Sequence, residues 1–90
     1  MIGNWNAKSG DIICLRQHYS WYWDPDNGAY YVSLSYGQLA VILNSKYAGH
    51  INGIEKYTLT LLTVPGCSIV ESTAHWYTWF ESWEVICVSP

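Results

Sequence analysis

Apolar and polar residues alternate along two segments of this chain, which is the pattern of half-buried β-strands. The longer segment covers residues 54–64 and is rich in threonine, a strand-favouring residue. One face would carry Tyr57, Leu59, Leu61 and Thr63, and the other Thr58, Thr60, Leu62 and Val64. The second segment, residues 30–36, places Tyr30, Val32, Leu34 and Tyr36 opposite Tyr31, Ser33 and Ser35. We expect it to form a half-exposed strand or an extended loop arm.

Shorter apolar runs predict the remaining strands. Residues 38–43 are apolar on both faces, which indicates a central strand. Residues 12–16, 69–71 and 84–88 are expected as the first, return and closing strands. Turn-forming residues predict turns at 24–28 and 65–68, the second of which would close a hairpin. Several Asn, Ser and Gly residues predict a loop over residues 44–53.

Residues 74–83 allow two interpretations. Trp76, Phe80 and Trp83 fall at the i, i+4, i+7 spacing of a helix face. Bulky aromatic residues, two threonines and the lack of a capping box favour instead a strand that ends in a turn at residues 81–83. As a strand, the segment would turn Trp76 and Trp79 to opposite faces, with one in the core and the other on the surface.

The length and the charge of the chain argue against several classes of protein. Ninety residues suit one small domain covering 1–90, and the longest apolar run has five residues, against the ~20 of a membrane-spanning helix. The first eight residues lack the pattern of a secretory signal, so we expect residence in a cytoplasm and no membrane contact. Four Lys and Arg residues face seven Asp and Glu residues, which disfavours binding to duplex nucleic acid.

The cysteine and histidine residues do not form a recognisable site. Cys14, Cys67 and Cys87 are an odd number, which favours reduced thiols over a disulfide framework. No two of the Cys and His residues stand at the close spacing typical of structural zinc sites. We therefore expect no metal, no cofactor and no enzymatic activity.

Aromatic residues make up 17% of the chain, too many for one small core. Consecutive aromatics in a strand point alternately to its two faces, so some rings of residues 19–23 would lie outside the core. One interpretation is an arm that folds back onto the rest of the domain. The other is a contact surface, since Trp and Tyr are enriched at interface hot spots. Its candidate residues are Trp21, Trp23, Tyr30, Tyr31, Trp76 and Trp79.

The order of these elements, with a few short motifs, resembles small SH3-like β-barrel proteins of tailed phages, notably marine ones. The matching segments are Gly10-Asp11-Ile12, Gly37 with residues 40–43, residues 61–63 with Gly66, residues 76–79 and residues 81–86. The resemblance implies an all-β, SH3-like five-stranded partly open barrel over about residues 9–89. It also implies viral origin, and it transfers no catalytic residue. Residues 18–36 form an aromatic-rich insertion in the first long loop, which departs from the family pattern.

Together these observations predict a non-enzymatic protein–protein interaction module encoded by a phage. It would act in the host cytoplasm after infection or as a small virion or assembly component, and its partner would be a second copy, a virion protein or a host protein. Two alternatives stay open. One is an inhibitor that binds a host enzyme, and the other is a domain that stacks a carbohydrate or nucleotide on exposed aromatic rings.

Overall fold

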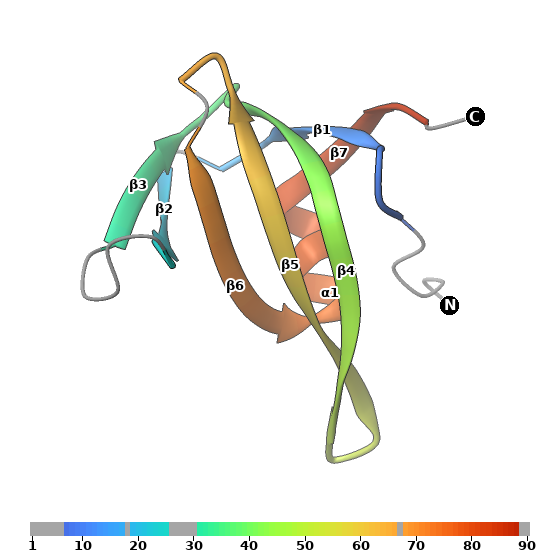
Figure 1. Ribbon diagram of the computed structural model, residues 1–90. Helices are drawn as coiled ribbons and strands as arrows, with labels where there is room; N and C mark the ends of the chain where they lie inside the picture. Colours follow the sequence, from blue (N-terminus) through green and yellow to red (C-terminus); the bar gives the residue numbers. More distant parts are fainter. Residues whose placement is uncertain (1–6, 18, 26–30, 67, 89–90) are drawn as a thin grey trace.

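Seven antiparallel strands form one sheet in the computed structural model, which describes residues 7–17, 19–25, 31–66 and 68–88. The strand order is β3-β2-β6-β5-β4-β1-β7 (Figure 1). Their bounds are β1 Ile12–Leu15, β2 Tyr19–Trp23, β3 Tyr31–Ser35, β4 Leu39–Ile51, β5 Ile54–Val64, β6 Ile69–His75 and β7 Trp83–Cys87. A short helix, α1 (Trp76–Ser82), connects β6 to β7. The expected all-β class is confirmed at this level.

The core lies on the face of the sheet that α1 covers. Its fully buried side chains come from β1, β4, β5 and β6: Ile13, Leu15, Ile42, Leu59, Leu61 and Val70. Trp79 from α1 and Trp83 from β7 join the same cluster. The expected faces of β5 are confirmed, because Leu59, Leu61 and Thr63 are buried while Val64 is exposed.

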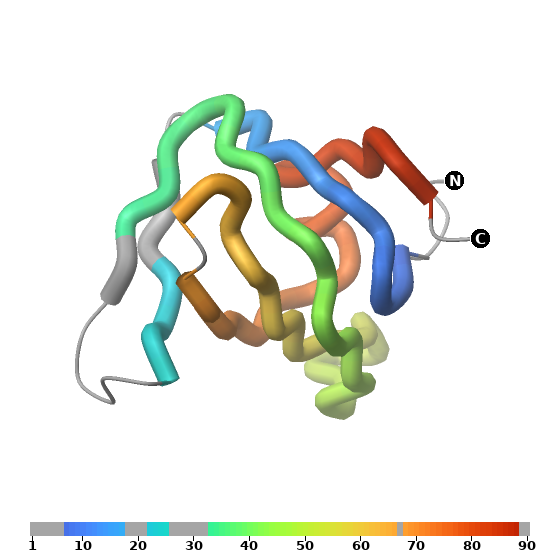
Figure 2. Tube along the Cα trace, turned by 45° about the horizontal axis from the view of Figure 1, so that its top comes forward, coloured from blue at the N-terminus to red at the C-terminus, as the bar shows by residue number. Residues whose placement is uncertain are grey.

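The sheet contains two strands more than the five expected, and both come from the 18–36 insertion. β2 and β3 pair over five consecutive residues, from Tyr19↔Ser35 to Trp23↔Tyr31. β2 then joins the rest of the sheet at the pair Trp23↔Glu71 on β6. Figure 2 shows this hairpin and the β1–β7 pair on opposite sides of β5 and β6. The segment expected as a strand or an arm is therefore a strand of the sheet.

The prediction of a loop over residues 44–53 is wrong. β4 continues to Ile51, and a turn at Asn52 and Gly53 returns the chain into β5, so the far half of this hairpin extends beyond the rest of the molecule (Figure 1). Asn52 and Gly53 have φ of 54° and 79°, the left-handed values that a tight hairpin turn requires. The register shifts between Ile42 and Asn44 and again between Tyr47 and His50, so bulges take up the residues that resemble a loop.

The prediction of a strand and turn over residues 74–83 is also wrong from Trp76 onward. β6 ends at His75, and Trp76–Ser82 form α1. No side chain caps the helix at His75, so its stability depends on burying Trp79 and Ser82. The helix is therefore held by tertiary packing that local propensity does not reveal. Trp83 begins β7, one residue before the expected closing strand.

The Gly-Asp pair before β1 forms a fixed turn. Gly10 has a φ of 92°, which favours glycine. The buried Asp11 carboxylate accepts hydrogen bonds from the backbone N–H of Lys8 at 3.0 Å and from its Nζ at 3.3 Å. This turn sets where β1 begins beside β4, and its role is structural.

Candidate interaction surface

One apolar side chain from each of five neighbouring strands stands in a single line across the sheet. The register pairs Ile12 with both Cys87 and Val41, Val41 with Leu62, and Leu62 with Ile69. The line therefore runs from β7 through β1, β4 and β5 to β6. We call these five residues the outer row: Cys87, Ile12, Val41, Leu62 and Ile69.

The outer row faces away from the core. Side chains alternate between the two faces of a strand, and the neighbours of the row along β1, β4, β5 and β6 are buried. These neighbours are Ile13, Ala40, Ile42, Leu61, Thr63 and Val70. Cys87 is exposed, and the other four members are half-buried because they flank one another. An antiparallel sheet with one face in solvent usually carries polar residues there, so this row is unusual.

The next line of paired residues is apolar on one side of the outer row and polar on the other, where the exposed Leu43 of β4 precedes the polar line. Cys14, Leu39 and Val64 form the next line of paired residues, and Val64 is 39% exposed. On the other side, the paired line is Asn44, Thr60 and Glu71. A polar line beside an apolar one is the arrangement of an interface core and its rim.

An ion pair lies at the β7 end of this face. Arg16 Nη2 is 3.2 Å from Glu84 Oε1, and Glu84 pairs in register with Cys14. The Arg16 guanidinium also lies over the Tyr36 ring, 5.8 Å from its centroid. Hydrogen bonds to Glu84 and Tyr36 raise the pKa of Arg16. The Arg16–Glu84 ion pair thus lies at the margin of the apolar area.

The candidate residues of the aromatic insertion are only partly described. Trp23 is half-buried, and it shares the outward face because Tyr22 beside it is buried and Glu71 opposite it is outward. Trp21 lies in β2 and Tyr31 in β3, but the structure does not describe their side chains. Tyr30 lies outside the described residues. Of these four, Trp23 is the one that the structure places on the same face as the outer row.

Tyr22 connects the insertion to the core. Its ring lies 6.5 Å from that of Trp79 and 6.1 Å from that of Trp83, and its hydroxyl accepts a hydrogen bond from Trp83 Nε1 at 3.0 Å. These three rings are buried together. The insertion therefore packs against the rest of the molecule through Tyr22, as the interpretation of a folded-back arm expects.

Trp76 and Trp79 both lie on α1. Trp79 is only 2% exposed, and its Nε1 donates to the Tyr57 carbonyl oxygen at 3.1 Å. Trp76 is half-buried, packs against the core and meets the Tyr77 ring edge-on at 6.0 Å. Trp79 is thus the core residue of the two, and its ring presents almost no surface to a partner.

A small cavity opens between the insertion, β6 and α1. Its volume is about 170 Å³, and Tyr22, Trp79 and Ala74 line it together with the polar residues Gln17, Ser72, Thr78 and Ser82. Ligand sites for small molecules are commonly about 300–1,000 Å³. The cavity is of a size for water or a single side chain of a partner.

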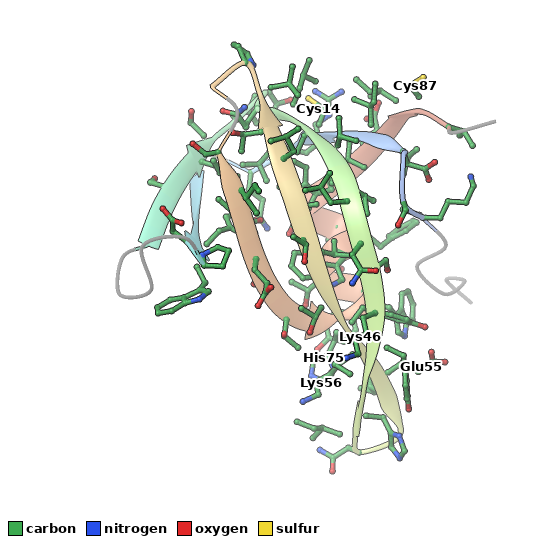
Figure 3. The ribbon with its side chains drawn as sticks, viewed as in Figure 1. Cys14, Lys46, Glu55, Lys56, His75 and Cys87 are labelled. Carbon is green, nitrogen blue, oxygen red and sulfur yellow. The ribbon has the colours of Figure 1, made fainter. Side chains whose placement is uncertain are left out.

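The thiol and imidazole groups are dispersed. Figure 3 shows Cys14 and Cys87 at the opposite end of the sheet from His75. Among the described residues, no three His, Cys, Asp or Glu side chains gather where they could hold a metal ion. His75 stacks on Tyr77 at 5.3 Å, and its buried Nδ1 has no hydrogen-bond partner. Cys67 and His18 lie outside the described residues.

Sequence reasoning missed the outer row. The available signal was apolar residues at the outward positions of four strands, such as Val41 beside buried Ala40 and Leu62 beside buried Leu61. That signal becomes a surface only when the register is known, because the five residues are far apart in the chain.

A search for membrane-spanning helices and three comparisons with known proteins complete the description. Within the part that the structure describes, no helix has the length and apolar character that crossing a membrane requires. The chain matches no protein-family model, no curated protein and no solved structure.

Proposed function

We propose that this chain is a non-enzymatic protein-interaction module and that the outer row is the centre of its contact surface. The observation that supports this is the line of apolar side chains on the outward face of five strands. Exposing such a line to water has a free-energy cost, which a partner that covers it removes. Charged residues are absent from the row, as in the cores of protein interfaces.

Trp23 adds an aromatic residue to the same face. It stands at the end of β2 opposite Glu71, in the polar line that adjoins the outer row. Tryptophan is enriched among interface hot spots, because its large ring buries much surface when a partner binds. We therefore retain Trp23 as a binding residue, beside the outer row.

The finer architecture that we propose is an SH3-like barrel with an inserted hairpin. Strands β1, β4, β5, β6 and β7 correspond to the five that the resemblance implies, and β2–β3 occupy the first long loop. The short helix before the last strand fits the same order. A phage source and a role in the virion or against a host enzyme are the parts of this proposal that rest on the resemblance.

Two lysine substitutions on one strand test the proposal. Leu62→Lys places a charge in the outer row, whereas Thr60→Lys places the same charge two residues away on the same face. A tagged chain is used to capture binding proteins from extracts of its host. We expect Thr60→Lys to retain the partner and Leu62→Lys to lose at least about tenfold of it, which is about 1.4 kcal/mol.

Folding must be measured on the same two variants. The lysine stem can lie along the sheet while its charge stays in water, so both variants should keep the unfolding midpoint of the original chain to within a few degrees. Equal capture by both folded variants would refute the outer row as the contact surface. The identity of the captured protein separates a virion component from an inhibitor of a host enzyme.

A further inference from the structure

The two edges of the sheet differ in how they are protected. β3 and β7 are the outermost strands, and within the described residues neither has a second strand beside it. A free edge presents unpaired backbone N–H and C=O groups that can pair with another chain. Natural proteins usually block such edges with charges, prolines or bulges.

β7 carries these protections. Its register against β1 shifts between Ile12 and Ile13, so a bulge interrupts the strand at Ile86. Glu84 adds a charge that the ion pair with Arg16 holds beside the strand. The β7 edge is therefore poorly suited to pairing with a further strand.

β3 carries no such protection. Tyr31–Ser35 contain no charged residue and no proline, and they pair with β2 over five residues without a register shift. Ser33 and Ser35 are exposed, while Leu34 between them is buried. The Ser35 carbonyl oxygen accepts a hydrogen bond from the Gln38 N–H at 3.0 Å, and the residues before it form a regular, uncharged template for one more strand.

The alternation of hydroxyl-bearing and apolar residues in β3 is preserved when the strand is reversed. In an antiparallel pairing centred on Ser33, Ser33 stands opposite Ser33, Leu34 opposite Val32 and Ser35 opposite Tyr31. Hydroxyl residues meet hydroxyl residues, and apolar residues meet apolar ones. A two-fold symmetric interface needs this self-complementarity, because the same patch serves both partners.

We propose that β3 pairs antiparallel with β3 of a second copy of this chain, about a two-fold axis at Ser33. The two sheets then join into one continuous sheet. The chain has a net charge of −3, but none of that charge lies on β3, so like charges do not meet at the contact. A five-residue strand pair is a small interface, so the dimer forms reversibly and depends on concentration.

This dimer is independent of the proposed function. β3 lies at the opposite edge of the sheet from Cys87, and no member of the outer row belongs to β2 or β3. The dimer can therefore fail while the outer row still binds its partner, and the reverse is also possible.

Cysteine substitutions on β3 test both the dimer and its register. In a Cys67→Ser, Cys87→Ser background, Ser33→Cys brings two thiols face to face across the axis. Opposed residues of antiparallel strands have Cα atoms about 4.5–5.5 Å apart, which a disulfide can span. Ser35→Cys is the matched control, since its two copies would stand about 13 Å apart along the strands.

We expect mild oxidation to give the Ser33→Cys disulfide dimer at least about tenfold faster than the Ser35→Cys dimer, because only the first pair meets disulfide geometry. Light scattering of the Cys67→Ser, Cys87→Ser background should show a mass that rises from monomer toward dimer between about 1 μM and 1 mM. Similar oxidation rates for both variants, faster oxidation of Ser35→Cys, or a monomer at all concentrations would overturn the proposal.

Discussion

The Tyr57 hydroxyl donates a hydrogen bond to Glu55 Oε2 on the same strand. The Tyr57 ring meets that of Tyr47 edge-on at 6.0 Å, and the Tyr57 carbonyl oxygen accepts the Trp79 indole N–H. The hydrogen bond to Glu55 is the main cause of a raised Tyr57 pKa, with burial and the charges of Glu55 and Tyr47 adding to it. Tyr57 therefore links the base of the long hairpin to the helix while its phenol stays protonated.

This raised pKa predicts a loss of stability in alkali. The folded state favours the protonated phenol, so the contribution is complete below the ordinary tyrosine pKa of 10.0 and is lost as pH rises through the folded value. Glu55→Ala removes the acceptor, so in an ultraviolet titration one phenol should ionise at lower pH than before. Glu71→Ala, on β6, should leave the titration unchanged. A shift of equal size in both variants would contradict the assignment to Glu55.

Alternation within β2 could be predicted from the sequence, but not which ring enters the core. The pattern requires Tyr22 to oppose its two neighbours, and the structure buries Tyr22. Its partners, Trp79 and Trp83, lie far along the chain, and Trp83 is 61 residues from Tyr22. The choice between the two faces therefore depends on tertiary contacts that local sequence does not contain.

Helix α1 depends on tertiary contacts, and Trp79 makes the most deeply buried of them. It has seven residues, no side-chain cap, no acidic residue in its first turn and no basic residue in its last. An isolated helix of this length is unstable in water. Burial of Trp79 and its bond to the Tyr57 carbonyl supply the stabilisation that the helix lacks by itself.

Two alanine substitutions on α1 separate its buried and exposed sides. Trp79→Ala should lower the free energy of unfolding by about 3–5 kcal/mol, because it leaves a cavity in the core. Phe80→Ala removes a neighbouring ring that is 53% exposed and should cost less than about 1 kcal/mol. Urea unfolding followed by circular dichroism gives both values. A cost for Phe80→Ala that equals the cost for Trp79→Ala would show that the buried side has been misidentified.

At the scale of elements, the sequence predicted strands well where alternation was regular, as in β5. The predictions were wrong where residues that are typical of loops stand within a strand. Asn44 and Gly49 resemble loop residues, yet β4 uses bulges in their neighbourhood to continue. The helical spacing of Trp76, Phe80 and Trp83 allowed a helix, but Trp83 belongs to β7, Phe80 is exposed, and Trp79 is the buried ring of α1. The spacing therefore left the helix open as an alternative to the favoured strand, and it did not identify the buried face.

At the scale of the molecule, the curved sheet keeps one face for the core and leaves an apolar line on the other. Ile12 and Leu62 belong to separate strands, and β4 alone joins them in register through Val41. The outer row is thus a property of the assembled sheet. Among the described residues, β3 forms the edge of the sheet beyond β2 and β6, so the two contact regions that we propose are separate.

The central claim is that a partner covers the outer row, and site-specific photo-crosslinking measures this most directly. A photoreactive residue replaces Val41 in the outer row, or Thr73 in the polar part of the same outward face on β6. We expect the probe at position 41 to form an adduct with one partner protein and the probe at position 73 to form little or none. Equal adducts from both positions, or none from position 41 while the partner is bound, would contradict the account.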